Sequence, residues 1–422
     1  MLTKAPRGTK DILPADSRAW QFIETKIRNI CARYGYEEIR TPTFEHTELF
    51  QRSIGEKTDV VDKEMYTFTD RGERSITLRP ENTASVVRAY LENKLYGQKP
   101  LNKLYYIGSM FRYDRPQAGR MREFHQFGVE ALGEANPLLD SEIIMLAWDF
   151  LRELGLQNLT VSLNSVGCPN CRPLYRKKLQ DYFRDKLDSL CHDCQDRFER
   201  NPMRILDCKA DSDKDFMAAA PAITDCLCDD CAAHFAAVQE NLRSVGVKFT
   251  LDPRLVRGLD YYTRTAFEIK CADLGAQSAV AGGGRYDKLV EEIGGPATPA
   301  VGFAVGLERV LLLMDKQNLS AVKESTTDVF VVSLDKSLQQ AAFALAQELR
   351  RSGIRTMLDY GGHSLKAQMR EANRLGASYA VFLGEDEMQN GQVMLKDMLA
   401  GEQEQVPRDN IGEILAKKLK IQ

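Results

Sequence analysis

Several features that would place a protein in a membrane or outside the cell are missing from this sequence. No run of about 18 consecutive apolar residues is present, so the chain offers no membrane-spanning helix. The N-terminal stretch MLTKAPRGTKDILPADSRAW lacks the apolar segment of an export signal. Internal repeats and low-complexity tracts are also absent. These absences favour a globular, cytoplasmic protein with no membrane partner.

The chain also lacks an excess of positive charge. Its 57 Lys and Arg residues stand against 60 Asp and Glu residues, which gives a net charge of −3. A nucleic-acid partner would therefore have to be held by a local basic surface. With 422 residues, of which 43% are hydrophobic, the chain is long enough for roughly two to four domains.

Hydrophobic periodicity predicts mixed helices and strands. Trp20, Ile23 and Ile27 indicate an amphipathic helix over 16–34. The other elements expected before residue 320 are a strand in YEEIRTPTFE broken by Pro42, strands at 104–113 and 122–133 joined by the polar loop DRPQAGR, a helix at 140–154, strands at 247–251, AFEIKC and SAVAGGG, and the strand-to-helix segment VGFAVGLERVLLLM.

The C-terminal part alternates between the two kinds of element. The apolar pattern lapses near residue 320 in DKQNLSAVKESTTD, which predicts a linker. The elements expected after it are strands in DVFVVSL, RTMLD, SYAVFLG and QVMLKD and helices at 337–351, 364–375 and 411–419. This order predicts a small α/β domain with a mixed or parallel sheet.

The segment FRYDRPQAGRMREFHQFGVEALG combines arginines with polar residues in an apolar strand. Because alternate side chains of a strand share a face, Gln126, Gly128 and Glu130 point the same way, and Arg112 lies on the partner strand. The glycine leaves room for a ligand, and guanidinium groups suit phosphate. These features favour a small-molecule site. A solvated, charge-rich hairpin is the alternative.

Two further segments place polar groups at turns. TLRPENTASVVRAYL puts Glu81 and Thr83 where a strand enters a helix, although Asn82 or Thr83 could simply cap that helix. LVRGLDYYTRTAFEI puts Arg257 and Tyr262 in one short loop, which could equally be a turn with core tyrosines.

A glycine run and an arginine complete the set of candidates. AVAGGGRYDKLV permits close approach of a ligand to the backbone, with Tyr286 beside it, but it is no Walker loop because no Gly-Lys-Ser/Thr follows. Arg309 lies in the first turn of the helix after GFAVG, where a surface arginine is also common.

The cysteines are concentrated in one region. Eight of the ten lie between Cys168 and Cys231 in tight pairs, which in a reducing cytosol is more typical of metal binding than of disulfides. A continuous helix between the first two pairs would span roughly 25 Å and would prevent them from sharing one ion. The sequence therefore predicts a structural Zn²⁺ site formed by Cys191, Cys194, Cys228 and Cys231. Cys168, Cys171, Cys208 and Cys226 are candidates for a second site, and reduced cysteines acting as small apolar residues are the alternative.

These segments together resemble a known family. The chain is similar to the bacterial type of histidyl-tRNA synthetase, a class II aminoacyl-tRNA synthetase. The resemblance rests on RGTKDILP, on GYEEIRTPTFEHTELF as motif 1, on SMFRYDRPQAGRMREFHQFGVEALG as motif 2, on AVGFAVGLERVLLL as motif 3, and on the two histidine signatures LVRGLDYYTRTAFE and AGGGRYDKL. It covers nearly the whole chain, and the two histidine signatures are its most specific part.

The resemblance implies an α+β fold. It has an antiparallel class II catalytic sheet of six or seven strands, a helical cysteine-rich insertion and a C-terminal α/β anticodon-binding domain. The expected division is 1–166 and 246–320 for the catalytic core, 167–245 for the insertion and 326–422 for the anticodon-binding domain. Motif 1 implies a homodimer.

The resemblance also implies an activity. Histidine and ATP, with Mg²⁺, give histidyl-adenylate and pyrophosphate, and the histidyl group then passes to the 3′ end of tRNA-His. Arg257, Arg112 and Arg309 would be the catalytic cations, and Arg112, Arg120 and Arg309 would bind ATP. The residues expected to bind histidine are Glu81, Thr83, Gln126, Glu130, Tyr262 and Tyr286.

Two sets of residues are candidates for tRNA contact. The resemblance places the motif 2 loop near the acceptor end, which makes Arg115 and Gln117 candidates for reading the end bases. Lys366, Arg370 and Arg374 recur every four residues, so they form one basic stripe on a helix that would suit an RNA backbone. An ordinary solvated helix face is the alternative.

Two other functional classes fit parts of the sequence. A histidine-binding regulator of an ATP phosphoribosyltransferase shares this core, but such chains lack the anticodon domain and have degraded second-half signatures. A pure RNA-binding protein would not need the arginine set at 112, 257 and 309. Pyrophosphate exchange with histidine and ATP discriminates between the three classes.

Overall fold

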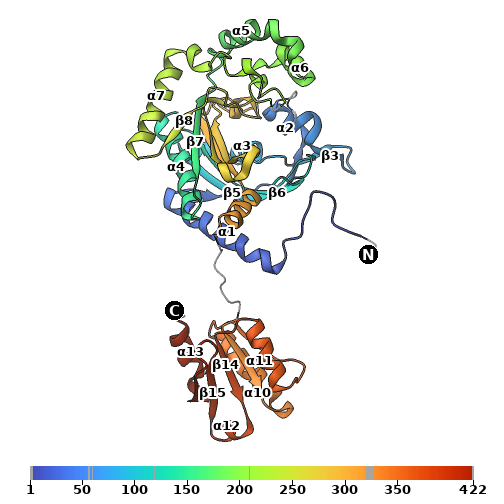
Figure 1. The fold of residues 1–422 in the computed structure, drawn as a ribbon, viewed down its shortest axis with the longest axis vertical. Helices are drawn as coiled ribbons and strands as arrows, with labels where there is room; N and C mark the ends of the chain where they lie inside the picture. Colours follow the sequence, from blue (N-terminus) through green and yellow to red (C-terminus); the bar gives the residue numbers. More distant parts are fainter. Residues whose placement is uncertain are drawn as a thin grey trace. The chain divides into compact units, whose positions relative to one another are not determined.

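The structure, a computed structural model, describes residues 3–420 except 56, 57, 59, 118, 209 and 320–326. The chain divides into two compact units, Met1–Ala321 and Val322–Gln422 (Figure 1). The linker expected near residue 320 falls largely on 320–326, outside the described residues. No helix in the described part is long and apolar enough to cross a membrane.

An eight-stranded sheet forms the centre of the first unit. Its order is β1 (Glu37–Glu38), β5 (Asn102–Phe111), β6 (Glu123–Leu132), β11 (Ala300–Gly306), β10 (Ala279–Arg285), β9 (Thr263–Cys271), β7 (Leu159–Ser165) and β8 (Phe249–Leu251). The six inner strands are antiparallel, as expected. Both edge strands are short and pair in parallel, which the expected count of six or seven strands did not include.

One face of this sheet is covered by helices (Figure 1). These are α1 (Pro14–Tyr34), α4 (Pro137–Glu153), α7 (Asp229–Ser244) and α9 (Leu307–Lys316). Phe127 and Val129 of β6 are buried among their apolar side chains. Because strand residues alternate between faces, Gln126 and Glu130 are directed to the opposite face. The helices therefore leave the second face of the sheet for the site.

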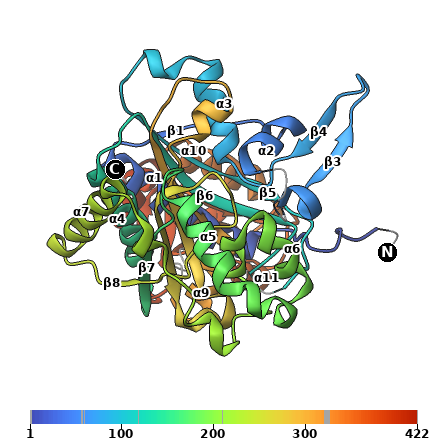
Figure 2. The same cartoon turned by 90° about the horizontal axis from the view of Figure 1, so that it is seen from above.

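A smaller layer lies beside the second face. Its three-stranded sheet has the order β2 (Phe44–His46), β4 (Ser75–Leu78) and β3 (Tyr66–Thr69), and the β3–β4 hairpin projects from the body (Figure 2). Helices α2 (Thr47–Ile54), α3 (Thr83–Glu92) and α8 (Leu289–Glu292) belong to this part, with a π-helix at Val60–Glu64. The strand predicted around Pro42 is thus two short strands, β1 and β2, in different sheets.

The cysteine-rich insertion lies between β7 and β8. It contains α5 (Arg172–Phe183), α6 (His192–Arg200) and α7, with short 3₁₀ turns at Arg184–Ser189, Pro202–Ile205, Asp215–Met217 and Ile223–Cys226. Tyr175, Leu179 and Phe183 build a core of its own. By contrast, α7 packs into the catalytic core, where His234 Nε2 lies 3.1 Å from Asp140 Oδ1 of α4.

The second unit is a five-stranded mixed sheet with helices on both faces. The order is β13 (Thr356–Leu358), β12 (Val329–Ser333), β14 (Tyr379–Leu383), β15 (Gln392–Asp397) and β16 (Gln403–Pro407). The first three strands are parallel and the last two antiparallel. The helices are α10 (Gln339–Arg351), α11 (Leu365–Arg374), α12 (Glu385–Gln389) and α13 (Ile411–Leu419). The sequence predicted the elements of this unit except β16 and α12, and a mixed or parallel sheet, but not the strand order.

Candidate active site

A cavity of about 310 Å³ opens on the sheet face opposite the covering helices. The nine residues predicted to bind histidine or ATP and the predicted catalytic Arg257 all contribute to its lining: Glu81, Thr83, Arg112, Arg120, Gln126, Glu130, Arg257, Tyr262, Tyr286 and Arg309. They come from β6, the start of α3, the motif 2 loop, the loop before β9, the end of β10 and the start of α9. Segments far apart in the sequence therefore meet at one cavity, whereas a solvated hairpin would leave them separate.

Glu130 forms the buried floor of the cavity. Its side chain is 1% exposed, and it accepts hydrogen bonds from the hydroxyl of Thr83, at 2.7 Å, and from that of Tyr286. Burial raises the pKa of Glu130 to about 8, although the two hydroxyl donors work in the opposite direction. A carboxyl group this deep in the protein can exchange a proton, or a hydrogen bond, with a ligand near neutral pH.

The first turn of α3 is capped by Glu81. Its carboxylate accepts from the backbone N–H groups of Thr83, at 2.7 Å, and Ala84, at 3.0 Å. Asn82 instead accepts a hydrogen bond from Thr41, so the capping role considered for Asn82 or Thr83 belongs to Glu81. The hydroxyl of Thr83 is left to hold Glu130. The helix start thus fixes two polar groups beside the cavity.

Arg112 is anchored at the edge of the cavity. Its Nε donates to the carbonyl of Pro80 at 2.8 Å, and its guanidinium lies over the ring of Phe124, 5.5 Å from the centroid. Burial lowers the pKa of Arg112 from its usual value, and the charges of Glu64 and Glu81 oppose that shift. Arg112 lines the cavity with its Nε already engaged, and a guanidinium group can bind an anionic ligand through its other N–H groups.

Arg257 is held by an ion pair. Its Nη1 donates to Glu268 of β9 at 2.6 Å, and its guanidinium lies 5.5 Å from the ring centroid of Tyr262. Burial acts against the charge, yet Tyr262 and Glu268 hold the pKa of Arg257 above its usual value. Gly282 makes this placement feasible, because a Cβ there would come within 2.5 Å of Arg257 Nη1.

Two more arginines reach the cavity from α9 and the motif 2 loop. Arg309 donates to the carbonyl oxygens of Ala279, at 2.6 Å, and Gly119, at 3.4 Å. Burial lowers the pKa of Arg309. Arg120 forms an ion pair with Asp114 of its own loop. Four guanidinium groups therefore line one cavity, and such a set suits a polyphosphate.

Gly128 corrects an expectation from the sequence. Its position opposite Tyr106 in the β5–β6 ladder means that an added Cβ would overlap the tyrosine ring. The glycine therefore makes room for Tyr106 rather than for a ligand. Gly302, which the sequence did not single out, has the direct role, because a Cβ there would overlap the Glu130 carboxylate.

Seven buried side-chain atoms of the described residues have no hydrogen-bond partner in the protein, and two of them matter most for the cavity. They are Oε1 of Gln126, an acceptor, and Nε of Arg257, a donor. Buried polar atoms are nearly always paired, by protein, water or ligand. Because both residues line the same cavity, it offers one acceptor and one cationic donor to a ligand.

The candidates for tRNA contact lie on surfaces. Arg115 and Gln117 are exposed in the loop between β5 and β6. In the second unit, Lys366, Arg370 and Arg374 are exposed along α11, while Gln368 and Ala372 of the same helix are buried. The predicted stripe therefore faces away from that unit's sheet. Arg374 also pairs with Glu371, at 2.7 Å.

The predicted cysteine tetrad is wrong. Cys191 and Cys194 lie with Cys208 and Asp211, whereas Cys228 and Cys231 lie with Cys168 and Cys171. The expected helix from 172 to 190 ends at Phe183, and α6 begins at His192. The start of α7 therefore meets the start of α5, not its far end. Cys226, a candidate for the second site, belongs to neither group and is buried in the insertion core.

Several lining residues were not found from the sequence. They are Tyr106, Asp114 and Glu268. Glu268 had a usable signal, because it is the single acidic residue in the apolar strand AFEIKC. Its partner Arg257 lies in the loop before β9, and how that loop folds back over the strand could not be read from the sequence.

The antiparallel sheet, the arginine-lined cavity on its open face and the separate α/β unit together define a class II aminoacyl-tRNA synthetase. The sequence model described as "Histidyl-tRNA synthetase" matches residues 8–171 and 194–310, and the model described as "Anticodon binding domain" matches 328–418. The chain belongs to the histidyl-tRNA synthetase family.

Individual relatives agree over the full length. The histidine–tRNA ligase of Desulforamulus reducens is 56% identical over 96% of this chain and 97% of its own. That of Pelotomaculum thermopropionicum is 54% identical over 99% of both chains. The crystal structure of apo histidyl-tRNA synthetase from S. aureus superposes with a TM-score of 0.84 at 40% identity, over 98% of this chain and 100% of that one.

Proposed function

We propose that the cavity is the site where this histidine–tRNA ligase activates L-histidine with ATP, before transfer of the histidyl group to the 3′ end of tRNA-His. The observation that carries the assignment is that two buried polar atoms of the cavity lack hydrogen-bond partners in the protein. Gln126 Oε1 lacks a donor and Arg257 Nε lacks an acceptor. Histidine supplies an ammonium group for the first, and a carboxylate or an α-phosphate supplies the acceptor for the second.

Glu130 and the tyrosines around it select the side chain of histidine. A neutral imidazole offers one donor and one acceptor nitrogen. Each Glu130 oxygen accepts a hydrogen bond from one hydroxyl group. The raised pKa leaves Glu130 largely protonated at neutral pH without a ligand, and the imidazole N–H favours the ionised carboxylate that accepts it. Tyr262 serves the second nitrogen and Tyr286 packs nearby. An amino acid without these two groups leaves buried polar atoms unpaired, which is the strongest basis for rejection.

Glu81, Thr83 and Gln126 hold the backbone end of histidine. The Glu81 carboxylate is fixed by two backbone donors. Burial raises the pKa of Glu81, and a bound ammonium group would reverse that shift by supplying a positive charge. Binding is thereby coupled to the ionised form of this carboxylate.

The arginines hold ATP and stabilise the transition state. The histidine carboxylate attacks the α-phosphorus, a new C–O–P linkage forms, and the bond to pyrophosphate breaks with its electron pair on the leaving group. Arg112 and Arg257 flank the α-phosphate, Arg309 contacts the polyphosphate and adenine, and Arg120 contacts the outer phosphates. Cations that are already in position before the reaction stabilise the charge of the transition state. Such electrostatic stabilisation is the main contribution to catalysis of phosphoryl-type transfer.

Mg²⁺ accompanies ATP as part of the substrate complex. This ion prefers oxygen ligands and is commonly held by one or two carboxylates together with substrate phosphates. Glu268 and Asp114 are carboxylates of the cavity that fit this donor set, although each also pairs with an arginine. When bound, the ion neutralises phosphate charge.

The tRNA is contacted by two sets of exposed residues, one in the motif 2 loop and one on α11. Arg115 and Gln117 read the acceptor end, and Lys366, Arg370 and Arg374 contact the RNA backbone from the second unit. In the division proposed here, 1–166 and 246–320 carry the chemistry, 167–245 form the insertion and 326–422 the anticodon-binding domain.

A homodimer completes the assembly. In the motif 1 segment, β2 is an edge strand, and its Phe44 is 55% exposed in the single chain. An exposed aromatic residue on an unpaired strand edge favours an interface. Sedimentation at micromolar concentration should give a dimer, and a sole species of 47.6 kDa would contradict it.

Pyrophosphate exchange tests the activity itself. The chain should exchange labelled pyrophosphate into ATP when L-histidine is present, and without tRNA. Exchange that is absent, or equal with other amino acids, would reject the assignment and favour a regulatory or purely RNA-binding role.

A further inference from the structure

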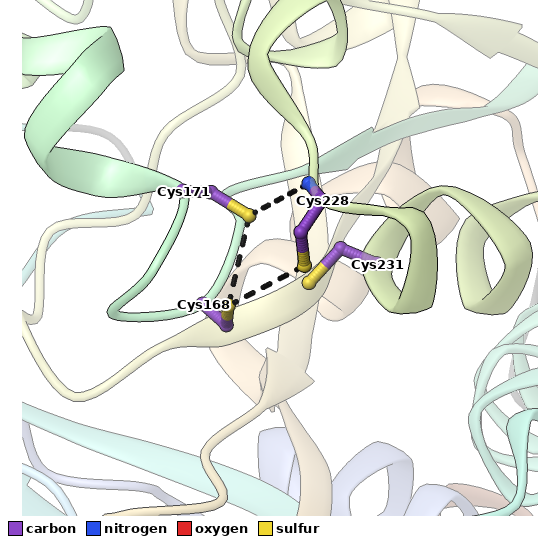
Figure 3. Close-up of side chains that lie close together, drawn as sticks. All are labelled: Cys168, Cys171, Cys228 and Cys231. Carbon is purple, nitrogen blue, oxygen red and sulfur yellow. Dashed lines mark hydrogen bonds between the residues drawn. The ribbon is translucent and has the colours of Figure 1, made fainter.

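Four cysteines converge where the insertion leaves and rejoins the catalytic core (Figure 3). Cys168 and Cys171 lie between β7 and α5, and Cys228 and Cys231 lie at the start of α7. The sulfur of Cys168 is 3.6 Å from that of Cys171 and 3.8 Å from that of Cys228, and all four sulfurs lie within 4.8 Å of one another. The adenylation chemistry uses none of them.

These separations are those of a tetrahedral thiolate site. With metal–sulfur bonds of about 2.3 Å, the four sulfurs of a Zn²⁺ centre are about 3.8 Å apart. A disulfide needs sulfurs about 2.05 Å apart, and all ten cysteines are unbridged. Two Cys-x₂-Cys pairs are also the usual ligand pattern of a structural zinc site.

The backbone around the cluster supplies a hydrogen-bond donor and two helix N-termini. The N–H of Cys228 donates to the sulfur of Cys171 at 3.2 Å. Cys171 and Cys228 are the N-cap residues of α5 and α7, where the positive ends of two helices meet. Hydrogen bonding and helix N-termini both stabilise the deprotonated cysteine that a metal requires.

Cys226 shows what a space-filling cysteine looks like in the same region. It is buried among the apolar residues of the insertion core and belongs to neither cluster. The four clustered sulfurs are instead directed at one another from two separate chain segments. That convergence distinguishes a ligand set from small apolar side chains.

We propose that Cys168, Cys171, Cys228 and Cys231 bind one structural Zn²⁺. The ion ties the beginning of the insertion to its last helix, α7, which itself packs in the catalytic core. It thereby closes the loop of chain from 168 to 231 at its base.

A different cluster carries a second structural Zn²⁺. Cys191, Cys194, Cys208 and Asp211 offer three sulfurs and one carboxylate oxygen within 4.8 Å, and the Cys191–Cys208 sulfur separation is 3.6 Å. The Asp211 side chain is 1% exposed and its orientation is fixed by the N–H of Cys191 and by Lys214 at 2.7 Å. A buried carboxylate beside three thiols matches a mixed zinc donor set.

The first ion has a consequence for the active site, which rests on the proposed function. The insertion donates three hydrogen bonds to the loop that carries the histidine signature. Arg172, next to Cys171, donates to the carbonyl of Tyr262, Arg204 donates to that of Arg257 at 2.8 Å, and Asn201 donates to Asp260 at 3.1 Å. Zinc at the base of the insertion therefore positions Arg257 and Tyr262 through these contacts.

Metal content tests both sites without reference to activity. Elemental analysis of the full chain, purified without chelators, should give about two zinc ions per chain. The double variant Cys228→Ser/Cys231→Ser and the double variant Cys191→Ser/Cys194→Ser should each lose one ion, and Cys226→Ala should keep both. A wild-type chain without zinc overturns both sites. A double variant that retains the wild-type content overturns the site it disrupts.

Substitution of Zn²⁺ by Co²⁺ tests the metal sites on the wild-type chain, so it does not depend on whether a variant folds. The wild-type chain, stripped of zinc and titrated with Co²⁺, should develop the visible bands of tetrahedral cobalt and the near-ultraviolet thiolate charge-transfer band. Octahedral cobalt without a thiolate band would overturn the proposal.

Zinc-stripped enzyme with Mg²⁺ restored should show a several-fold rise in KM for histidine and a smaller change in KM for ATP. Unchanged histidine KM would overturn the positioning role alone.

Discussion

The basic residues of the two units are held in opposite ways. In the cavity, Arg112, Arg257 and Arg309 each donate to a fixed acceptor, at 2.8, 2.6 and 2.6 Å. On α11, the basic side chains project into solvent, and that of Arg374 is 70% exposed. Fixed cations suit a transition state, because they need no rearrangement as charge develops. Exposed cations suit an RNA backbone, because they replace its counterions.

Arg257→Ala should have the largest effect. The fixed cation beside the α-phosphate is lost, so kcat for adenylate formation should fall by roughly 100-fold or more, the scale of a lost electrostatic stabiliser. Histidine binding should change far less. Pyrophosphate exchange and equilibrium binding measure the two separately.

Arg254→Ala is the matched control, since this exposed arginine lies three residues away in the same segment. It should retain wild-type exchange. An Arg257→Ala enzyme within a few-fold of wild type would remove the catalytic role from this side chain.

Glu130→Gln should weaken histidine recognition. The glutamine amide replaces the charged carboxylate acceptor of the imidazole N–H by a neutral one. Hydrogen bonds to charged groups contribute about 1.5–3 kcal/mol. KM for histidine should therefore rise by roughly 10- to 100-fold, with KM for ATP nearly constant. Equal changes in both constants would point to a general loss of structure instead.

The same substitution should change how stability depends on pH. The pKa of Glu130 is about 8 in the folded protein, against a usual value of 4.5, so the folded state keeps a proton that the unfolded state has lost between these values. Stability of the wild type therefore falls as pH rises through this window. Relative to Glu130→Gln, the free energy of unfolding of the wild type should fall by about 2 kcal/mol between pH 6 and 7.5. Denaturant unfolding without ligands, at several pH values, measures this difference. A constant difference would contradict the raised pKa.

The triple variant Lys366→Gln/Arg370→Gln/Arg374→Gln should have the smallest effect. Removal of exposed cations should raise KM for tRNA several-fold and reduce the salt dependence of tRNA binding by about one unit of slope per lost phosphate contact. Unfolding should change little, because exposed charges contribute little to stability. Binding titrations at several salt concentrations measure the slope, and an unchanged slope would make α11 an ordinary solvated face.

Local patterns predicted most of the longer helices and strands but not the sheet order, since alternation and helical periodicity identify elements without reference to their neighbours. Pro42 correctly marked a break, but the sequence could not assign β1 and β2 to different sheets. Alternation along β6 also placed Gln126 and Glu130 on the site face. Side-chain contacts between elements were missed, because they depend on how the chain folds back on itself. Gly128 was assigned to a ligand although Tyr106 fills its space, and Glu268 was overlooked although it holds Arg257.

The cysteines show the same limit. Their type and spacing indicated metal binding, but the partners were chosen on the assumption that one helix runs from 172 to 190. The 3₁₀ turn at Arg184–Ser189 ends that helix early, and its charged sequence carries no strong stop signal such as Gly or Pro. One undetected turn was enough to exchange the partners of both pairs.

Pyrophosphate exchange, run side by side on Arg257→Ala and on the α11 triple variant, tests the contrast between the two sets of cations most directly. Exchange needs histidine and ATP but no tRNA. Arg257→Ala should therefore lose about 100-fold or more, while the triple variant keeps the wild-type rate and is impaired only in charging tRNA. Normal exchange in Arg257→Ala, or an equal loss in the α11 variant, would contradict the account.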